Sequence, residues 1–201
     1  MITKESIVRR QLSVVIALIE LASLALLLVL LEQDFAPQKK GALLLVLLPM
    51  LFGLHVMEEF VIPGGFIAWD NLNRPQFTDT PGSYYVKVNA LPGAACVLLV
   101  LGSFDYRGGY SPFGIRAWLL ILTFMSWNAF FHLRGAIHTR RYSPGMVTGL
   151  AGFLPLMAIS YLYFIGSGAV DRLSALAAVG VALAIQPVLD FIKNHGREKH
   201  A

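Results

Sequence analysis

The sequence predicts an all-α integral membrane protein, built as a single domain from a bundle of six transmembrane helices. Composition is the first reason: of 201 residues, 56% are hydrophobic and only 14% are charged, with a mean hydropathy of +0.65, whereas a soluble domain carries about 25% charged residues. The second reason is the presence of six apolar runs with roughly the 20 residues that a spanning helix needs. These observations exclude a disordered tail and argue against a soluble globular domain.

The six apolar runs are bounded by charged residues, Gly or Pro and lie at about 11–31, 41–62, 87–104, 114–138, 145–166 and 172–192. The first run follows Lys4, Arg9 and Arg10, as the apolar core of a signal peptide would. Its apolar stretch is about 20 residues rather than 7–15, however, and no small-residue cleavage pattern follows it. We therefore expect this run to be retained as a membrane anchor.

The basic residues are unevenly distributed among the connections. If the N-terminus is cytoplasmic, eleven of the sixteen Lys and Arg residues face the cytoplasm and five face outside, which favours six spans with both termini inside. The net charge of +4 then reflects topology and attraction to anionic membrane lipids. No stretch combines dense Lys and Arg with polar surroundings, so nucleic acid is not an expected partner.

The longest connection, about 64–86, is rich in turn-forming and aromatic residues. It contains Gly64-Gly65 and Pro81-Gly82, and this density of turn residues argues against a further helix. Its five aromatic side chains suit the membrane interface, with a lid over an opening on the cytoplasmic side as the alternative. They are Phe66, Trp69, Phe77, Tyr84 and Tyr85. No internal repeat is visible, so the sequence does not support a transporter of the inverted-repeat type.

A few polar and ionisable residues lie inside the expected spans, where they are costly unless they face the bundle interior. In the second span, at 100° per residue, Glu58 lies about 60° to one side of His55 and Glu59 about 40° to the other. In the fourth span, Asn128 and His132 are four residues apart and share one face. Each span therefore directs its polar residues within a narrow arc.

The two polar groups are predicted to lie at the same depth. His55 precedes Pro63 by eight residues and His132 precedes Arg140 by eight, so each histidine lies about 12 Å from the cytoplasmic end of its helix. Both helices run from outside to inside. We therefore expect a polar pocket between the second, fourth and fifth spans that opens toward the cytoplasmic leaflet.

Neutral imidazole together with carboxylate is the ligand set of catalytic zinc and of non-haem iron sites. We expect His55, Glu59 and His132 to hold a divalent metal ion, zinc or iron, with Glu58 as a further ligand, as the general base, or as a partner that supports one of the ligands. Asn128 would orient a ligand or the substrate. The predicted function is an intramembrane enzyme that hydrolyses or oxidises an apolar or amphiphilic, lipid-like substrate.

Three other interpretations of the same residues remain open. Glu58 and Glu59 form an acid/base pair without any metal if one is protonated, as an isomerase or cyclase of isoprenoid-like substrates requires. The same groups would carry protons in a small proton-coupled transporter. Finally, Glu, His and Asn side chains can simply hydrogen-bond helices to one another.

Residues near the cytoplasmic ends of the spans are candidates for binding the substrate. The segment after Tyr142 has the composition of a helix start, with Ser143 as N-cap and Pro144 at the first helical position. The free N–H groups of that helix start, together with Arg141, would bind a phosphate or carboxylate headgroup. The candidate substrate-binding set consists of Tyr142, Arg141, Thr148 and Asn89.

Two further residues are left without an assigned role. Glu20 lies about 15 Å into the first span from Arg10, a depth close to that of His55, and is a candidate additional acidic member of the site. His138 lies 240° around the helix from His132 and cannot share its face. We expect His138 to interact with the C-terminal end of its helix.

Three short motifs occur in order along the chain: H-V-M-E-E at 55–59, N-A-F-F-H at 128–132 and Y-S-P-G at 142–145. Together they resemble the motifs of the HXXEE-domain family of bacterial membrane proteins. The resemblance implies an inner-membrane, multi-pass protein suspected of being an enzyme, with the His and Glu residues as its site, and it implies no particular reaction. The four-residue spacing of His55 and Glu59 is also similar to the acid/base pair of sterol-isomerase bundles, which implies the metal-free alternative.

Overall fold

The computed structural model describes residues 3–32, 39–104 and 109–198. In these residues the extended elements are all helices, as predicted, and an isolated β-bridge joins Phe104 and Tyr110. The helices are α1 Lys4–Glu32, α2 Lys39–Phe60, α3 Phe66–Asn73, η1 Pro75–Phe77, α4 Gly82–Gly102, α5 Pro112–Thr139, η2 Thr148–Phe153, α6 Leu154–Gly166 and α7 Arg172–Glu198. Of these, η1 is a 3-10 helix and η2 is a π-helix that continues directly into α6.

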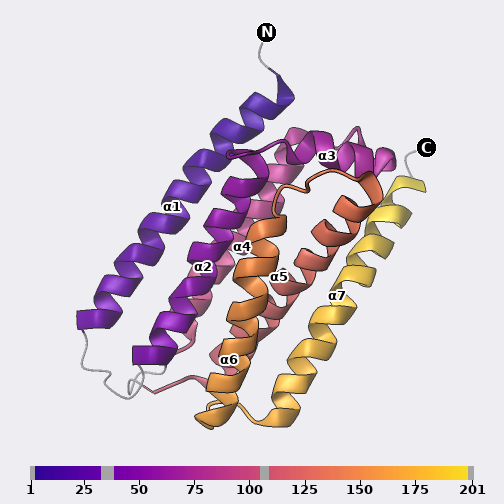
Figure 1. Ribbon diagram of the computed structural model, residues 1–201. Coiled ribbons are helices and arrows are strands. Elements are labelled where there is room, and N and C mark those ends of the chain that lie inside the picture. Colours follow the sequence, from indigo (N-terminus) through magenta and orange to yellow (C-terminus); the bar gives the residue numbers. More distant parts are fainter. Residues whose placement is uncertain (1–2, 33–38, 105–108, 199–201) are drawn as a thin grey trace.

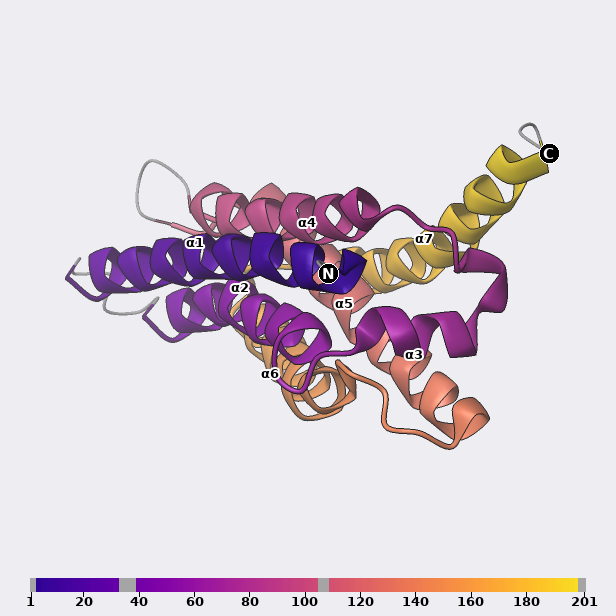
Figure 2. The same cartoon turned by 90° about the horizontal axis from the view of Figure 1, so that it is seen from above.

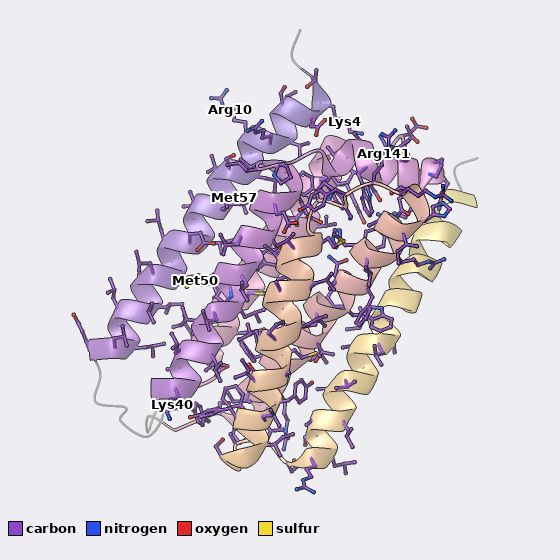
Figure 3. The ribbon with its side chains drawn as sticks, in the orientation of Figure 1. Lys4, Arg10, Lys40, Met50, Met57 and Arg141 are labelled. Carbon is purple, nitrogen blue, oxygen red and sulfur yellow. The ribbon has the colours of Figure 1, made fainter. Side chains whose placement is uncertain are left out.

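The long helices run side by side in alternating directions, and the short helix α3 lies across one end of the bundle (Figures 1 and 2). α1 packs on α2 and α4, while α5 contacts α4, α6 and α7. The start of α1 and the end of α7 lie at the same end of the bundle. In Figure 3, Lys4, Arg10 and Arg141 lie at this end and Lys40 lies at the opposite end.

Five helical segments in the described part of the chain are long and apolar enough to cross a membrane: Lys4–Glu32, Lys40–Phe60, Gly82–Gly102, Pro112–Thr139 and Thr148–Gly166. The sixth expected span coincides with α7, in which Arg172–Ile185 is a shorter apolar stretch. Large apolar side chains such as Leu18, Leu21 and Leu28 are exposed on the outside of α1, as contact with lipid would require. These features indicate a multi-pass membrane protein.

The expectation that no helix forms in the connection 64–86 is wrong. α3 and η1 both form there, and α4 begins at Gly82. α3 starts after Gly65, whose φ of 86° lies in the left-handed region that glycine tolerates. Trp69 and Tyr85 are buried rather than exposed at an interface. The turn residues therefore bound a short helix, which is stabilised because one of its faces packs against the end of the bundle.

A hydrogen bond between α2 and α5 compensates for the proline inside α2. Pro49 has no N–H, so the carbonyl of Leu45 lacks its usual helical donor. The indole Nε1 of Trp118 on α5 donates to that carbonyl at 3.1 Å, and Trp118 is fully buried. The two helices that carry the polar motifs are thereby tied together ten residues before His55.

Candidate functional site

Three buried side chains from two helices converge at one point. His55 and Glu59 lie one turn apart on α2, and His132 faces them from α5. Glu59 Oε1 lies 3.6 Å from His55 Nε2 and 3.3 Å from His132 Nε2. The exposed fractions of His55, Glu59 and His132 are 3%, 5% and 0%. We call these three residues the His/Glu centre; Met57, labelled in Figure 3, marks its level in the bundle.

Asn128, one turn before His132 on α5, reaches the same point. Its side-chain Nδ2 lies 3.3 Å from His55 Nε2 and 3.2 Å from His132 Nε2. The amide therefore lies beside both of the imidazole nitrogens that face Glu59. The structure thus brings together four of the five polar residues that the sequence places at one level.

The outer nitrogen of each imidazole contacts a hydroxyl group. His55 Nδ1 lies 2.8 Å from Thr148 Oγ1, and His132 Nδ1 lies 2.8 Å from Ser143 Oγ. Thr148 donates its single hydroxyl proton to Glu58 Oε2 at 2.6 Å, so its oxygen accepts from His55 Nδ1–H. His55 consequently presents the lone pair of Nε2 to the centre.

Glu58 points away from the His/Glu centre. Its Oε1 accepts hydrogen bonds from the Tyr142 hydroxyl and, at 3.0 Å, from the Val147 N–H. Its Oε2 accepts from the Thr148 N–H at 2.8 Å and from the Thr148 hydroxyl. Four donors fill the acceptor positions of an ionised carboxylate. Glu58 is therefore not placed as a metal ligand or as a base facing the centre, and of the three expected roles it has the position of a partner that supports a ligand, since it contacts His55 through Thr148.

The expected helix start at Ser143-Pro144 is also wrong. The helix begins after Gly145, and the Ser143 hydroxyl contacts His132 instead of capping the helix. The carboxylate of Glu58 accepts from the first free N–H groups, and a negative charge at a helix N-terminus is stabilising. The helix end that the sequence offered to an anionic headgroup is therefore filled by a side chain of the protein itself.

Tyr142 connects Glu58 with the protein surface. Its exposed fraction is 45%, and its hydroxyl donates to the Glu58 carboxylate. Partial burial and this carboxylate raise the pKa of Tyr142 well above its ordinary value. The phenol is therefore protonated at neutral pH and remains a donor to Glu58.

Aromatic side chains cover the His132 side of the centre. Trp69 of α3 stacks on the imidazole, with ring centroids 5.7 Å apart and an interplanar angle of 23°. Phe66 and Phe131 lie 5.9 Å and 5.3 Å from the same ring. Because α3 lies across the end of the bundle (Figure 2), it shields the centre from the aqueous side.

Gly145 lies against both imidazoles. A Cβ at this position would lie 2.7 Å from His132 Cε1 and 2.8 Å from His55 Cε1, too close for any real contact. The backbone φ of Gly145 is 97°, in the region that favours glycine. The Y-S-P-G segment therefore ends in the one residue type that allows the chain to pass this close to the two rings.

The spacing of the three ligand atoms suits a small divalent cation. Two atoms that each lie 2.0–2.2 Å from a tetrahedral metal ion are about 3.3–3.6 Å apart. Glu59 Oε1 lies at 3.3 Å and 3.6 Å from the two Nε2 atoms, and all three ligand atoms lie within 4.8 Å of one another. The hydroxyl contacts at Nδ1 are of the kind that orients metal-binding imidazoles.

Four other candidate residues lie outside the centre. Asn89 is buried, and its amide donates to a backbone carbonyl of its own helix at 2.8 Å. Arg141 and His138 are exposed. Glu20 lies against Gly53 of α2, where any Cβ would overlap its carboxyl group. None of the four is part of the convergent group.

Sequence analysis missed the contacts that hold the centre in place. Ser143 was interpreted as a helix cap and Trp69 as an interfacial residue, yet each contacts His132. The signal for Ser143 was its place in the Y-S-P-G motif, eleven residues after His132. No sequence signal pointed from Trp69 to His132, because the contact depends on how α3 folds back over the bundle.

One cavity of the bundle lies away from the His/Glu centre. It has a volume of about 490 Å³ and lies between α4, α5 and α7, with apolar lining residues such as Leu99, Leu120 and Val181. Arg116 at this cavity pairs with Asp171 at 3.2 Å. No residue of the His/Glu centre lines the cavity.

Comparison with known families gives one match. The sequence model of a family described as "Protein of unknown function with HXXEE motif" matches residues 46–160, more than half of the chain. The matched region contains all three polar motifs. No curated protein and no solved structure matches the chain.

A first prediction concerns the space at Gly145. Gly145→Ala should lower the free energy of unfolding in detergent by about 1–3 kcal/mol more than Gly168→Ala, because overpacking adds to the backbone strain. Gly168 is a matched control, since its φ is 74° and nothing lies within 4 Å of its added Cβ. Equal losses in the two variants, measured by thermal or denaturant unfolding, would show that the rings do not need this space.

A second prediction concerns the carboxylate of Glu58. Glu58→Gln keeps the size of the side chain but replaces one acceptor oxygen by a donor, so we expect a loss of about 1.5–3 kcal/mol in unfolding free energy. Tyr142→Phe removes only one of the four donors, from a half-exposed position, and should cost about 0.5–1.5 kcal/mol. An effect of Glu58→Gln no larger than that of Tyr142→Phe would contradict the role of Glu58 in joining α2 to η2.

Proposed function

The chain belongs to the family of proteins with the HXXEE motif, and from the geometry of its His/Glu centre we propose that it is a membrane-embedded, metal-dependent enzyme that acts on a lipid-like substrate. One observation carries the proposal. Two imidazole nitrogens and one carboxylate oxygen, each of a type that binds divalent metal ions, converge in a buried site between α2 and α5.

Electrostatics supports a cation at this point. When both Nε2 atoms are unprotonated, they and Glu59 Oε1, at 3.3 Å and 3.6 Å, repel one another unless a proton or a metal ion lies between them, and the repulsion is strong where water is excluded. A divalent ion would be balanced by two carboxylates, Glu59 directly and Glu58 through Thr148 and His55. The group would then carry no net charge, which lowers the cost of placing it within a membrane.

The surrounding residues would act on the reaction through binding and orientation. His55, Glu59 and His132 would hold the ion, while Thr148 and Ser143 keep the imidazoles in the orientation that ligation needs. When bound, zinc would supply Lewis-acid chemistry for hydrolysis, and iron would supply redox chemistry for oxidation.

The position of the centre supports a lipid-like, apolar or amphiphilic substrate. The ligands lie on helices that are apolar enough to cross a membrane, near the end of the bundle where Lys4, Arg10 and Arg141 lie (Figure 3). With six spans and both termini cytoplasmic, this end faces the cytoplasmic leaflet of the inner membrane. A substrate embedded in that leaflet would have its polar part at the level of the centre.

A metal-free acid/base enzyme is the second candidate, and the contacts of Asn128 favour it. An amide NH₂ can donate one hydrogen bond to each of the two Nε2 atoms, which satisfies both imidazoles without an ion. A protonated Glu59 would then be the proton donor to the substrate. Glu58 is not available for this exchange, because its oxygens are occupied.

Metal content separates the two candidates. We expect protein purified in detergent to bind close to one equivalent of zinc or iron, measured by elemental analysis, and His55→Ala and His132→Ala to lose it. His138→Ala is the control, since His138 is exposed and outside the centre. Absence of bound metal after loading with either ion, or equal content in all variants, would contradict the metal-dependent proposal.

Enzymatic activity can be tested without knowing the substrate. Membranes from cells that produce the wild-type protein should differ from those that produce His132→Ala in one lipid class, detected by mass spectrometry. Hydrolysis would convert that class into two smaller products, and oxidation would shift its mass by oxygen or hydrogen. Identical lipid profiles, with both proteins folded and the wild type metal-loaded, would argue against a lipid enzyme.

A further inference from the structure

We infer that Asn128 is a fourth ligand of the metal ion, bound through its side-chain oxygen. This inference rests on the proposed metal centre and adds a residue that is neither a histidine nor a carboxylate. It turns a three-ligand group into a set of four protein ligands, two nitrogen and two oxygen donors, to which the substrate would add as a fifth ligand during the reaction.

The position of the Asn128 side chain supports its role as a ligand. The end of the Asn128 side chain lies 3.2 Å and 3.3 Å from the two Nε2 atoms, the separations that adjacent ligands of a tetrahedral ion show. Glu59 Oε1 stands in the same relation to both nitrogens. Asn128 and Glu59 therefore occupy equivalent positions with respect to the pair of imidazoles.

With a metal ion bound, the amide oxygen of Asn128 rather than its nitrogen would face the ion. An NH₂ group at this position donates to the Nε2 lone pairs, but these same lone pairs bind the metal ion and are then no longer acceptors. The N–H dipoles would also point at the cation. A half-turn of the planar amide places the carbonyl oxygen where the nitrogen lies, and amide oxygens are established ligands of divalent cations.

Other described residues that lie close to the two histidines offer no competing ligand atom. Gly145 lies against both rings and has no side chain. Trp69 and Phe66, which lie against His132, offer no ligand atom. Glu58, the remaining nearby carboxylate, is held by four donors. Asn128 is thus, like Glu59, a polar side chain in direct contact with the Nε2 atoms of both histidines.

The test is the metal affinity of position-128 variants, measured by Co²⁺ titration of the metal-stripped, detergent-purified protein. Asn128→Ala should bind Co²⁺ at least about 10-fold more weakly than wild type, and Asn128→Asp should bind at least as tightly, because its carboxylate replaces the amide oxygen. The visible Co²⁺ bands, which report the ligand set, should change in both variants. Thr123→Val is the matched control, since Thr123 is a buried polar residue of α5 that bonds Tyr161.

The opposite result has a clear meaning. If the amide acts as a donor to the imidazoles, its removal frees both lone pairs, and Asn128→Ala would bind Co²⁺ as tightly as wild type or more tightly. That outcome would overturn the inference while leaving the centre intact, provided that His55→Ala still abolishes binding. Failure of the wild type to bind Co²⁺, zinc or iron would instead overturn the metal centre itself. Asn128→Asp has nearly the size of asparagine and keeps the test valid if the alanine variant does not fold.

Discussion

The carboxylate of Glu58 organises the polar end of this bundle. It extends from α2 to the start of η2 and accepts hydrogen bonds from Tyr142, Val147 and Thr148. These bonds place the turn 142–148 directly over α2 and α5. Within that turn, Thr148 and Ser143 contact the two histidines and Gly145 passes between them. The position of the imidazoles therefore depends on a residue that does not itself face the centre.

The arrangement follows a general constraint on polar groups in membranes. A side chain that is withdrawn from water must find its partners within the protein. Here Glu58 has four donors, and the outer nitrogens of His55 and His132 each have a hydroxyl group. Within the described residues, the partners of the Glu59 carboxylate are the two facing imidazole nitrogens. The centre is consequently the point where the polar network is incomplete without a cation or a proton, and this is the physical basis of the proposed chemistry.

Most residues of the centre could be predicted from the sequence. Helical periodicity and equal distances from the helix ends placed His55, Glu59, Asn128 and His132 together, because both rules depend only on the geometry of a straight helix. The same periodicity also placed Glu58 in the group, since an arc of about 100° includes it. Side chains at the two edges of such an arc face different neighbours, and only the packing of η2 beside α2 decided that Glu58 faces the other way.

Sequence by itself determined the helical class, the apolar spans and the level of the polar residues, because composition and spacing along a helix are local properties. Tertiary structure decided that α3 forms and stacks Trp69 on His132, that Ser143 orients an imidazole instead of capping a helix, and that Glu58 fills the helix N-terminus. Each of these depends on two segments that are distant in sequence and meet only in the folded bundle. The physical reason is that a polar group in an apolar environment takes the best partner within reach, and the fold determines which partners are within reach.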